Sequence, residues 1–362
     1  MKATRESKAA KGNPSERLLR WYKRHGRDLP WRKRRDPYAI WVAEAMLQQT
    51  TVGAVIPYYE RWLLALPDIN SLVAASPDKV MKLWEGLGYY SRALSLHKAA
   101  GIIVGERRGV FPVGESEWRT LPGVGSYTAA ALAAIVDGRR RVAIDGLVRR
   151  VLFRFLGMEG DATKAQAVER MRVEGLVLIS KKHPGDSVQA IMDLATAVCM
   201  KTNPKCTECP IARFCAAYAA GDPGRLPLRK RKSLKSIDVV VGIWLRNGAV
   251  YLQRRPNHGL FAGLWELPGG KVDVGESPVD AVIREFREEL GRSVHPVETL
   301  PIVQHAYTSF KVQLHPFIVR GTGPKPKTAT EGLFVSLPKI RQYAQPAANK
   351  KIWRLFFERK EA

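Results

Sequence analysis

The sequence lacks any apolar run that approaches the roughly 18 residues of a membrane-spanning helix. Its first 12 residues are polar and basic, and they lack the apolar core of a secretory signal peptide. Residues 1–14 instead have the composition of a disordered basic tail. These absences favour a soluble intracellular protein, and we expect it in the cytoplasm.

Acidic residues are also scarce. The 362 residues include 34 Asp and Glu against 59 Lys and Arg, which gives a formal net charge of +25. A surplus of this size favours a polyanionic partner, and nucleic acid is the first candidate because no segment suits a membrane. The length leaves room for two or three domains.

Cysteine is rare and confined to one segment, which excludes a distributed disulfide framework. Six residues separate Cys199 from Cys206, two separate Cys206 from Cys209, and five separate Cys209 from Cys215. Thiolates at this density are typical ligands of tetrahedral zinc or of a [4Fe–4S] cluster, and the spacing alone leaves both open. We expect a structural role for this centre, because the segment is a compact loop between helices.

Residues 121–150 combine a glycine turn with an acid. Pro122, Gly123 and Gly125 interrupt a helical pattern that restarts at Ser126, so two helices flank a turn whose amides suit a phosphate. Such a turn grips a nucleic-acid backbone without reading bases, although an ordinary helix hairpin has the same signature. Asp145 then precedes another helical pattern, where an isolated residue would simply be a helix N-cap.

A second acid lies in residues 38–51, which have a clear helical period. Ile40, Ala43 and Leu47 form an apolar stripe, and Glu44 falls on it. Burial there would raise the pKa of Glu44 toward the range of a general acid. The alternative is a structural Glu paired with an arginine.

Two further segments suit contact with bases. Residues 27–32 interleave arginines with a tryptophan, and residues 84–90 place tyrosines after a glycine turn. Gln48 and Gln49 close the helix that carries Glu44, where their amides either bind bases or face water. A charged loop and a helix-packing corner are the structural alternatives for the first two segments.

The chain changes character after the cysteines. Residues 218–236 have linker composition, and strand patterns with a hairpin signal at Arg246-Asn247-Gly248 follow from residue 237. Within this α+β region, Ser277-Pro278 opens a helix on which Glu285, Glu288 and Glu289 share one face. Clustered carboxylates suit a hard cation such as Mg²⁺, or a solvated face paired with arginines.

In this order the motifs resemble those of the MutY adenine DNA glycosylases, of the helix-hairpin-helix superfamily. The likeness spans roughly residues 15–358, and its most specific segments are LPWR at 29–32, EAMLQQT at 44–50, GLGYYSRA at 86–93, LPGVGSYTAA at 121–130 and IDG at 144–146. It implies a mainly α helix-hairpin-helix glycosylase domain over 15–217 with an Fe–S cluster loop at 199–215, a basic linker over 218–236 and a MutT-like (Nudix) α+β domain over 237–362.

The resemblance also implies a base-excision repair activity. A monomeric enzyme would flip adenine paired with 8-oxoguanine or guanine out of double-stranded DNA and hydrolyse its N-glycosidic bond. Glu44 would protonate adenine at N7, Asp145 would stabilise the cationic sugar, and Tyr127 would support both. Residues that would line the pocket or contact DNA are Arg27, Leu29, Trp31, Arg32, Gln48, Gln49, Tyr89, Gly123, Gly125 and Gln189.

Two groups of related enzymes differ from this chain at the positions of Tyr127 and Glu44. Bifunctional relatives such as endonuclease III place a Schiff-base lysine where this chain has Tyr127, so a monofunctional enzyme is expected. Thymine-mismatch relatives lack the acid at the position of Glu44, which points to adenine. The resemblance further implies that Cys199, Cys206, Cys209 and Cys215 ligate a [4Fe–4S] cluster.

Three departures from the family pattern stand out. Leu147 replaces an asparagine beside the catalytic acids, which puts the rate in question. Thr308 and Ser309 occupy the loop that senses 8-oxoguanine, and Ser309 replaces a histidine, so weaker discrimination against guanine is expected. The Nudix box, usually eroded, is nearly whole from Gly270 to Gly291.

The box leaves alternatives open. It is similar to a working nucleotide pyrophosphohydrolase site with Glu285, Glu288 and Glu289 as Mg²⁺ ligands, alone or beside the glycosylase. The alternative, which is favoured because the domain is expected to recognise the lesion on DNA, is a box retained as a folding element. A non-catalytic Fe–S protein that binds DNA is favoured only if Leu147 abolishes turnover.

Overall fold

The computed structural model describes residues 12–227, 235–307, 310–321, 326 and 331–359. Its contacts divide the chain into two units: Met1–Ser71 with Lys98–Lys230, and Leu72–His97 with Arg231–Ala362. The sequence placed residues 72–97 in the glycosylase domain, whereas their contacts group them with the C-terminal domain. Thr308, Ser309 and most of the predicted basic tail lie outside the described residues.

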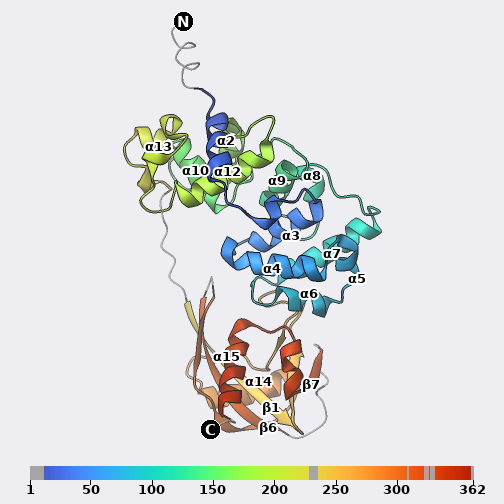
Figure 1. The fold of residues 1–362 in the computed structure, drawn as a ribbon. Coiled ribbons are helices and arrows are strands. Elements are labelled where there is room, and N and C mark those ends of the chain that lie inside the picture. The colour runs from blue at the N-terminus through green and yellow to red at the C-terminus, as the bar shows by residue number, and fades with distance from the viewer. Residues whose placement is uncertain (1–11, 228–234, 308–309, 322–325, 327–330, 360–362) are drawn as a thin grey trace, which may run out of the picture. The chain divides into compact units, whose positions relative to one another are not determined.

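The first unit is helical (Figure 1). Its elements are α2 (Pro14–His25), η1 (Pro30–Arg32), α3 (Pro37–Leu47), α4 (Val52–Ala65), α8 (Glu115–Trp118), α9 (Ser126–Ile135), α10 (Gly146–Phe155), α11 (Ala165–Glu174), η2 (Gly175–Leu178), α12 (Pro184–Ala197), η3 (Cys206–Glu208), η4 (Ala212–Phe214), α13 (Ala216–Ala219) and η5 (Pro223–Arg225). Two further helices, α5 (Ile69–Ala74) and α7 (Ser91–Gly105), cross the boundaries between the units. No described helix is both long enough and apolar enough to cross a bilayer.

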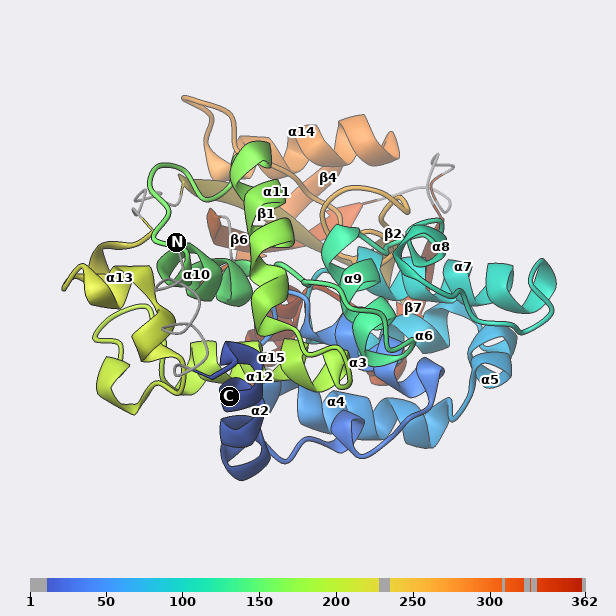
Figure 2. The same cartoon turned by 90° about the horizontal axis from the view of Figure 1, so that it is seen from above.

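Helix α12 organises the core of this unit. It packs against α2, α9 and α10 (Figures 1 and 2). Its Val188, Ile191 and Leu194 are buried in the core of this unit. The alanine-rich α9 is buried from Thr128 to Ala134, because its small side chains let neighbouring helices approach closely. Asp145 precedes α10, a helix of this core, and Glu44 stands on α3, which packs against α9.

Part of the predicted linker is structured. Residues 218–227 include the end of α13 and the turn η5, and Leu226 is buried against the core of the first unit. Arg154 Nε donates to the Leu226 carbonyl at 2.8 Å, which satisfies a buried backbone acceptor. Residues 218–227 have the composition of a linker, but the buried side chain of Leu226 holds this segment against the first unit.

The second unit contains α6 (Pro77–Trp84) and a mixed sheet. Its strands are β1 (Lys235–Arg246), β2 (Ala249–Arg254), β3 (Trp265–Glu266), β4 (Val294–Thr299), β5 (Val303–Ala306), β6 (Phe310–Gly321) and β7 (Gly332–Ser336), and η6 (Leu337–Gln342) follows. The order within the described residues is β3-β2-β1-β6-β4, with β5 beside β6 and β7 beside β2. Strands β1 and β6 run parallel, from Lys235 opposite Phe310 to Trp244 opposite Val319.

One helix covers each face of the sheet. Val240 and Trp244 of β1 pack with α14 (Pro278–Leu290), whereas Val241 and Ile243 pack with α15 (Ala347–Glu358). This alternation follows the two-residue period of a strand. Gly242 is required here, because an added Cβ would lie 2.2 Å from the ring of Phe286.

The predicted hairpin is confirmed. Arg246 pairs with Ala249, and Asn247 and Gly248 both have positive φ, as the shortest hairpin turn requires. Helix α14 begins after the N-cap Ser277, as predicted. A helical unit followed by a sheet between helices confirms the predicted fold class.

Candidate active site

One cavity of the first unit gathers most of the predicted site. It has a volume of about 1010 Å³. Its lining includes Arg27, Leu29, Trp31 and Arg32 from the segment around η1, Glu44 from α3, Tyr127 from α9, Asp145 and Leu147 at the start of α10, and Gln189 from α12. Residues separated by up to 162 positions in the sequence, Arg27 and Gln189, therefore face one space.

Glu44 is buried in this cavity wall, with 5% of its surface exposed. Burial raises its pKa from 4.5 to about 7, although the hydrogen bond from the Tyr127 hydroxyl to Oε2, at 3.1 Å, acts in the opposite direction. The negative charge of Asp145 raises it further. Its hydrogen-bond partner in the described structure is a phenol rather than the arginine of the structural alternative. With this pKa, Glu44 can donate a proton near neutral pH.

Asp145 is the N-cap of α10, and its Oδ1 accepts the Val148 amide hydrogen at 2.7 Å. Burial raises its pKa above 3.8, while the backbone amides of Val148 and Leu147 favour the charged form. The structural reading of Asp145 as a cap is therefore correct, and the cap also faces the cavity. One carboxyl group can act as an acid there while its neighbour supplies negative charge.

The two pocket arginines share one buried carboxylate that sequence reasoning missed. Asp193 of α12 is 2% exposed; its Oδ1 is 2.6 Å from Arg27 Nη2, and its Oδ2 is 2.7 Å from Arg32 Nη1. Burial acts to raise the pKa of Asp193, but the hydrogen bonds and positive charges of Arg32 and Arg27 lower it below its ordinary value. The arginines are thereby fixed as part of the pocket wall. Asp193 lies four residues after Gln189 on the same face of the helix, which is the signal that could have identified it.

Substituting Asp193 with asparagine is expected to destabilise the protein by about 3–5 kcal/mol, because two partly buried arginines lose their counter-ion. Urea unfolding followed by circular dichroism measures the change. Asp28→Asn is the matched control, since Asp28 forms an exposed ion pair with Lys33 and should cost less than about 1 kcal/mol. Equal effects of the two substitutions would contradict the assigned role of Asp193.

The remaining predicted DNA contacts lie outside this cavity lining. Gly123 has positive φ, Gly125 precedes α9 as its N-cap, and an added Cβ at Gly125 would meet open space, so the turn is accessible. Gln48 donates to Thr128 Oγ1 at 3.0 Å and so links α3 to α9. Gln49 is exposed with positive φ. Tyr89, in the second unit, is likewise exposed with positive φ.

The four cysteines line a second, small cavity beside α10. Arg154 crosses this region almost fully buried, and its Nη1 donates to Cys199 Sγ at 3.4 Å and to the Met200 carbonyl at 2.7 Å. Burial, together with the neighbouring sulfurs, raises the pKa of the Cys209 thiol to about 12. Within the described residues, no group of three or more His, Cys, Asp or Glu side chains is arranged to hold a single metal ion.

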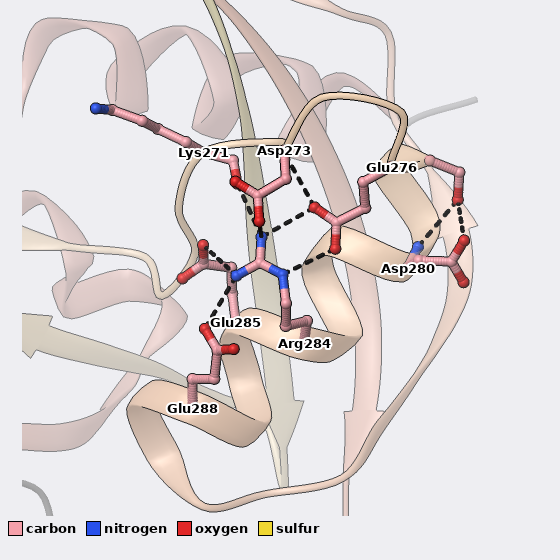
Figure 3. Close-up of polar contacts among 8 residues, drawn as sticks. Lys271, Asp273, Glu276, Asp280, Arg284, Glu285 and Glu288 are labelled. Atoms are coloured by element: carbon pink, nitrogen blue, oxygen red, sulfur yellow. Dashed lines mark hydrogen bonds and ion pairs between the residues drawn. The ribbon is translucent and has the colours of Figure 1, made fainter.

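The acidic box of the second unit is held by one arginine (Figure 3). Arg284 of α14 pairs with Glu276 at 2.8 Å, and with Glu285 and Glu288 at 3.0 Å each. Glu289 instead accepts a hydrogen bond from Gln253 of β2 at 2.8 Å. The three predicted Mg²⁺ ligands therefore lie together, but two of them are paired with Arg284.

The chain matches curated proteins along most of its length. It is 32% identical to the adenine DNA glycosylase of Rattus norvegicus, covering 94% of this chain and 77% of that protein. It is 31% identical to that of Buchnera aphidicola subsp. Acyrthosiphon pisum, covering 94% of this chain and 91% of that protein. The chain belongs to the adenine DNA glycosylase family.

Two domain families and one solved structure agree with this membership. Residues 42–174 match the HhH-GPD superfamily of base excision DNA repair proteins, and residues 239–355 match the NUDIX domain. A thermostable thymine-DNA glycosylase structure is 25% identical, with a TM-score of 0.52 over 57% of this chain and 95% of that chain. This adenine DNA glycosylase family member is therefore an enzyme of base-excision repair, and its predicted helix-hairpin-helix and Nudix folds are confirmed.

Proposed function

We propose that the chain hydrolyses the N-glycosidic bond of adenine paired with 8-oxoguanine or guanine in double-stranded DNA. The observation that carries this proposal is the cavity in which Glu44, with a pKa near 7, lies beside Asp145. Adenine leaves as a neutral base only after protonation, and its departure leaves a cationic sugar that a carboxylate stabilises.

The two acids take different roles. Glu44 protonates adenine at N7 and then assists the attacking water, because its raised pKa keeps it partly protonated at neutral pH. Asp145 carries the negative charge that stabilises the developing sugar cation. Tyr127 holds Glu44 in place through its hydroxyl. Arg27, Arg32 and Gln189 shape the base pocket from positions that Asp193 and α12 fix.

We infer that base removal proceeds without strand cleavage. The side chain hydrogen-bonded to Glu44 is that of Tyr127, whose phenol forms no Schiff base with the sugar. Lys182 also lines the cavity and is the amine that could contradict this inference. Borohydride treatment during turnover on a duplex with adenine opposite 8-oxoguanine should trap no covalent complex, and trapping through Lys182 would overturn the monofunctional assignment.

The opposite base tests the substrate assignment. Duplexes with adenine opposite 8-oxoguanine, guanine, cytosine or thymine are compared under single-turnover conditions. We expect release only opposite 8-oxoguanine and guanine, with a smaller difference between those two than the family pattern implies, because Ser309 replaces a histidine. Equal release from all four duplexes would contradict the proposed substrate.

We propose that Cys199, Cys206, Cys209 and Cys215 hold a [4Fe–4S] cluster. They supply four thiols around one cavity, and the buried guanidinium of Arg154 donates to Cys199 Sγ, so that a positive charge lies beside the proposed cluster. A single zinc ion needs its sulfurs about 2.3 Å from one point, whereas a cluster holds them further apart. When bound, the cluster supplies a covalent cross-link that orders residues 199–215.

Tyr127→Phe is expected to shift the pH dependence of adenine release. The hydroxyl stabilises the charged form of Glu44, so its removal raises the pKa of Glu44. A hydrogen bond to a charged group contributes about 1.5 kcal/mol, which corresponds to about one pKa unit. The alkaline limb of the rate profile should therefore move to a pH about one unit higher. Single-turnover rates between pH 5.5 and 9 measure the shift, and a limb that moves downward would contradict the role of Tyr127.

Leu147→Asn is expected to accelerate adenine release about tenfold. Leu147 lines the cavity next to Asp145, and an amide at this position would donate a hydrogen bond near the carboxylates that an isobutyl group cannot. A gain of about 1.4 kcal/mol in the transition state corresponds to this factor. The comparison uses single-turnover rates of the two proteins at pH 7, and an unchanged or slower rate would show that the pocket is adapted to leucine.

Nucleotide hydrolysis at the C-terminal box is a second candidate function. The observation that favours it is the nearly complete set of box residues on one loop and helix (Figure 3). Gly270 is so close to Glu285 that an added Cβ would lie 2.3 Å from its carboxylate. Burial raises the pKa of Glu266 to about 7, and the nearby charge of Glu289 raises it further. Carboxylates therefore lie close to one another at this end of the sheet. A divalent cation would relieve their repulsion.

Incubation of the full chain with 8-oxo-dGTP and Mg²⁺ tests this candidate. Hydrolysis that Glu288→Gln abolishes, while adenine release is retained, would support it. Absence of hydrolysis would leave the box as a loop-and-helix scaffold held by Arg284.

A further inference from the structure

Glu85 is a buried carboxylate that the catalytic account does not use. It follows α6 as its C-cap, its side chain is 7% exposed, and it directly precedes the turn Gly86–Tyr90 that carries Tyr89. A carboxylate at this depth is costly unless it is paired. Its partners therefore reveal what the position does.

The partners of Glu85 come mainly from the C-terminal part of the second unit. Oε1 accepts the backbone amide hydrogen of Gln345 at 2.9 Å, and Oε2 lies 3.1 Å from Lys350 Nζ of α15. Lys82, one turn earlier in α6, pairs with Oε2 at 2.7 Å and also donates to the Arg341 carbonyl in η6. One carboxylate thus joins the end of α6 to η6, to the segment after it and to α15.

This junction is connected to the core of the second unit. Gln345 is buried, and its Oε1 accepts a hydrogen bond from Trp353 Nε1 of α15 at 2.8 Å. Trp353 in turn packs in the core between α15 and the sheet. Two hydrogen bonds, both made by Gln345, therefore connect Glu85 to the core of the Nudix domain.

The turn that follows Glu85 is tightly shaped. Gly86, Gly88 and Tyr89 all have positive φ, which is strained for a tyrosine. The Gly86 amide donates to the Tyr90 hydroxyl at 3.0 Å, and the Gly88 carbonyl accepts from Trp84 Nε1 at 3.2 Å. These bonds leave Tyr89 as the exposed side chain, 40% accessible, at the tip.

We propose that Glu85 is a positioning residue through which the Nudix domain sets the placement of Tyr89 in the opened duplex. The proposal rests on the proposed function and on the expectation from the sequence that Tyr89 contacts bases, here by entering the stack of the opened duplex. Glu85 is joined covalently to the turn, and Lys350 and the Gln345 amide link its carboxylate to the C-terminal domain. Loss of its charge therefore frees the turn relative to that domain. A wedge that is displaced by about 1 Å no longer opens the duplex efficiently.

A double-mutant cycle tests this proposal. Glu85→Gln keeps the shape and removes the charge, and we expect it to lower single-turnover adenine release about tenfold. In a Tyr89→Ala background the same substitution should have no further effect, because Glu85 acts through Tyr89. A purely stabilising role would instead lower the rate by the same factor in both backgrounds, and that result, or an unchanged rate in the native background, would overturn the proposal.

Two further variants provide a second test of the proposal and a matched control. Lys350→Gln breaks the same link from α15 at a half-exposed position and should reproduce the effect of Glu85→Gln even if the latter folds poorly. Asp78→Asn is the matched control, because Asp78 also connects α6 to the sheet, through Arg254 at 2.6 Å, but lies at the start of α6, away from the turn. It should leave the rate unchanged, and a tenfold loss there would overturn the assignment to Glu85.

A readout without catalysis separates this proposal from the proposed function. Fluorescence of 2-aminopurine placed beside an A:8-oxoguanine pair rises when the neighbouring bases unstack. We expect a smaller rise with Glu85→Gln than with the native protein, even if no adenine is released. An equal rise in both proteins would overturn the positioning role, whereas a rise without adenine release would count only against the proposed chemistry.

Discussion

Replacement of Asp145 with asparagine is expected to lower single-turnover adenine release by about a hundredfold to a thousandfold. The carboxylate faces the cavity that contains Glu44, and its charge is what stabilises a cationic sugar. Asparagine is as good an N-cap as aspartate, so the Val148 amide keeps its partner and α10 keeps its start. The substitution therefore removes the charge with little effect on the fold.

The control for Asp145→Asn is Asp186→Asn. Asp186 lines the same cavity but is half exposed and lies 3.8 Å from His183 as its ion-pair partner. We expect this variant to retain most of the activity, and thermal unfolding should show both proteins within a few degrees of the native chain. If Asp145→Asn released adenine at the native rate, the assignment of the active site would be wrong.

Glu44→Gln is expected to lower the rate by a factor of about 10² to 10⁴, the usual contribution of a positioned general acid. The amide oxygen of glutamine can still accept the hydrogen bond from Tyr127, so the loss reflects the proton and not the packing. Burial of the native carboxyl group is what raises its pKa to about 7. The native rate should therefore fall above pH 7, about tenfold per unit, as the acid form is lost.

The pH profile of the variant distinguishes this mechanism from others. Between pH 6 and 9, Glu44→Gln should show no alkaline limb from this group, because glutamine does not titrate there. Persistence of the native limb in the variant would assign it to another residue. A residual rate comparable to that of the native protein would exclude Glu44 as the acid.

Local pattern was enough to predict the local setting of both acids, whereas the catalytic role of Asp145 came from the family resemblance. Glu44 interrupts an apolar helical stripe, and Asp145 follows an apolar run and precedes a helix, so each position predicts burial or a cap from its neighbours alone. The same holds for the Asn247-Gly248 turn, whose conformation depends only on residues that tolerate positive φ. These features are encoded within a few residues.

Features that depend on distant partners were not predicted. Arg27 and Arg32 were interpreted as base contacts, but their shared counter-ion, Asp193, lies more than 160 residues away. Residues 72–97 group with the C-terminal domain through contacts such as Glu85 with Lys350, which no local pattern reveals. Strands β3, β4 and β7 were not predicted, because they gain their stability from pairing, β3 and β7 with β2 and β4 with β6.

Release of free adenine tests the central claim most directly. The full chain, in excess over a duplex with adenine opposite 8-oxoguanine, is quenched at intervals, and free base and strand length are both measured. A duplex with thymine in place of the adenine serves as the control. We predict a single exponential release of adenine, intact strands until alkaline treatment, and no base released from the control. Binding of the duplex without adenine release would contradict the account.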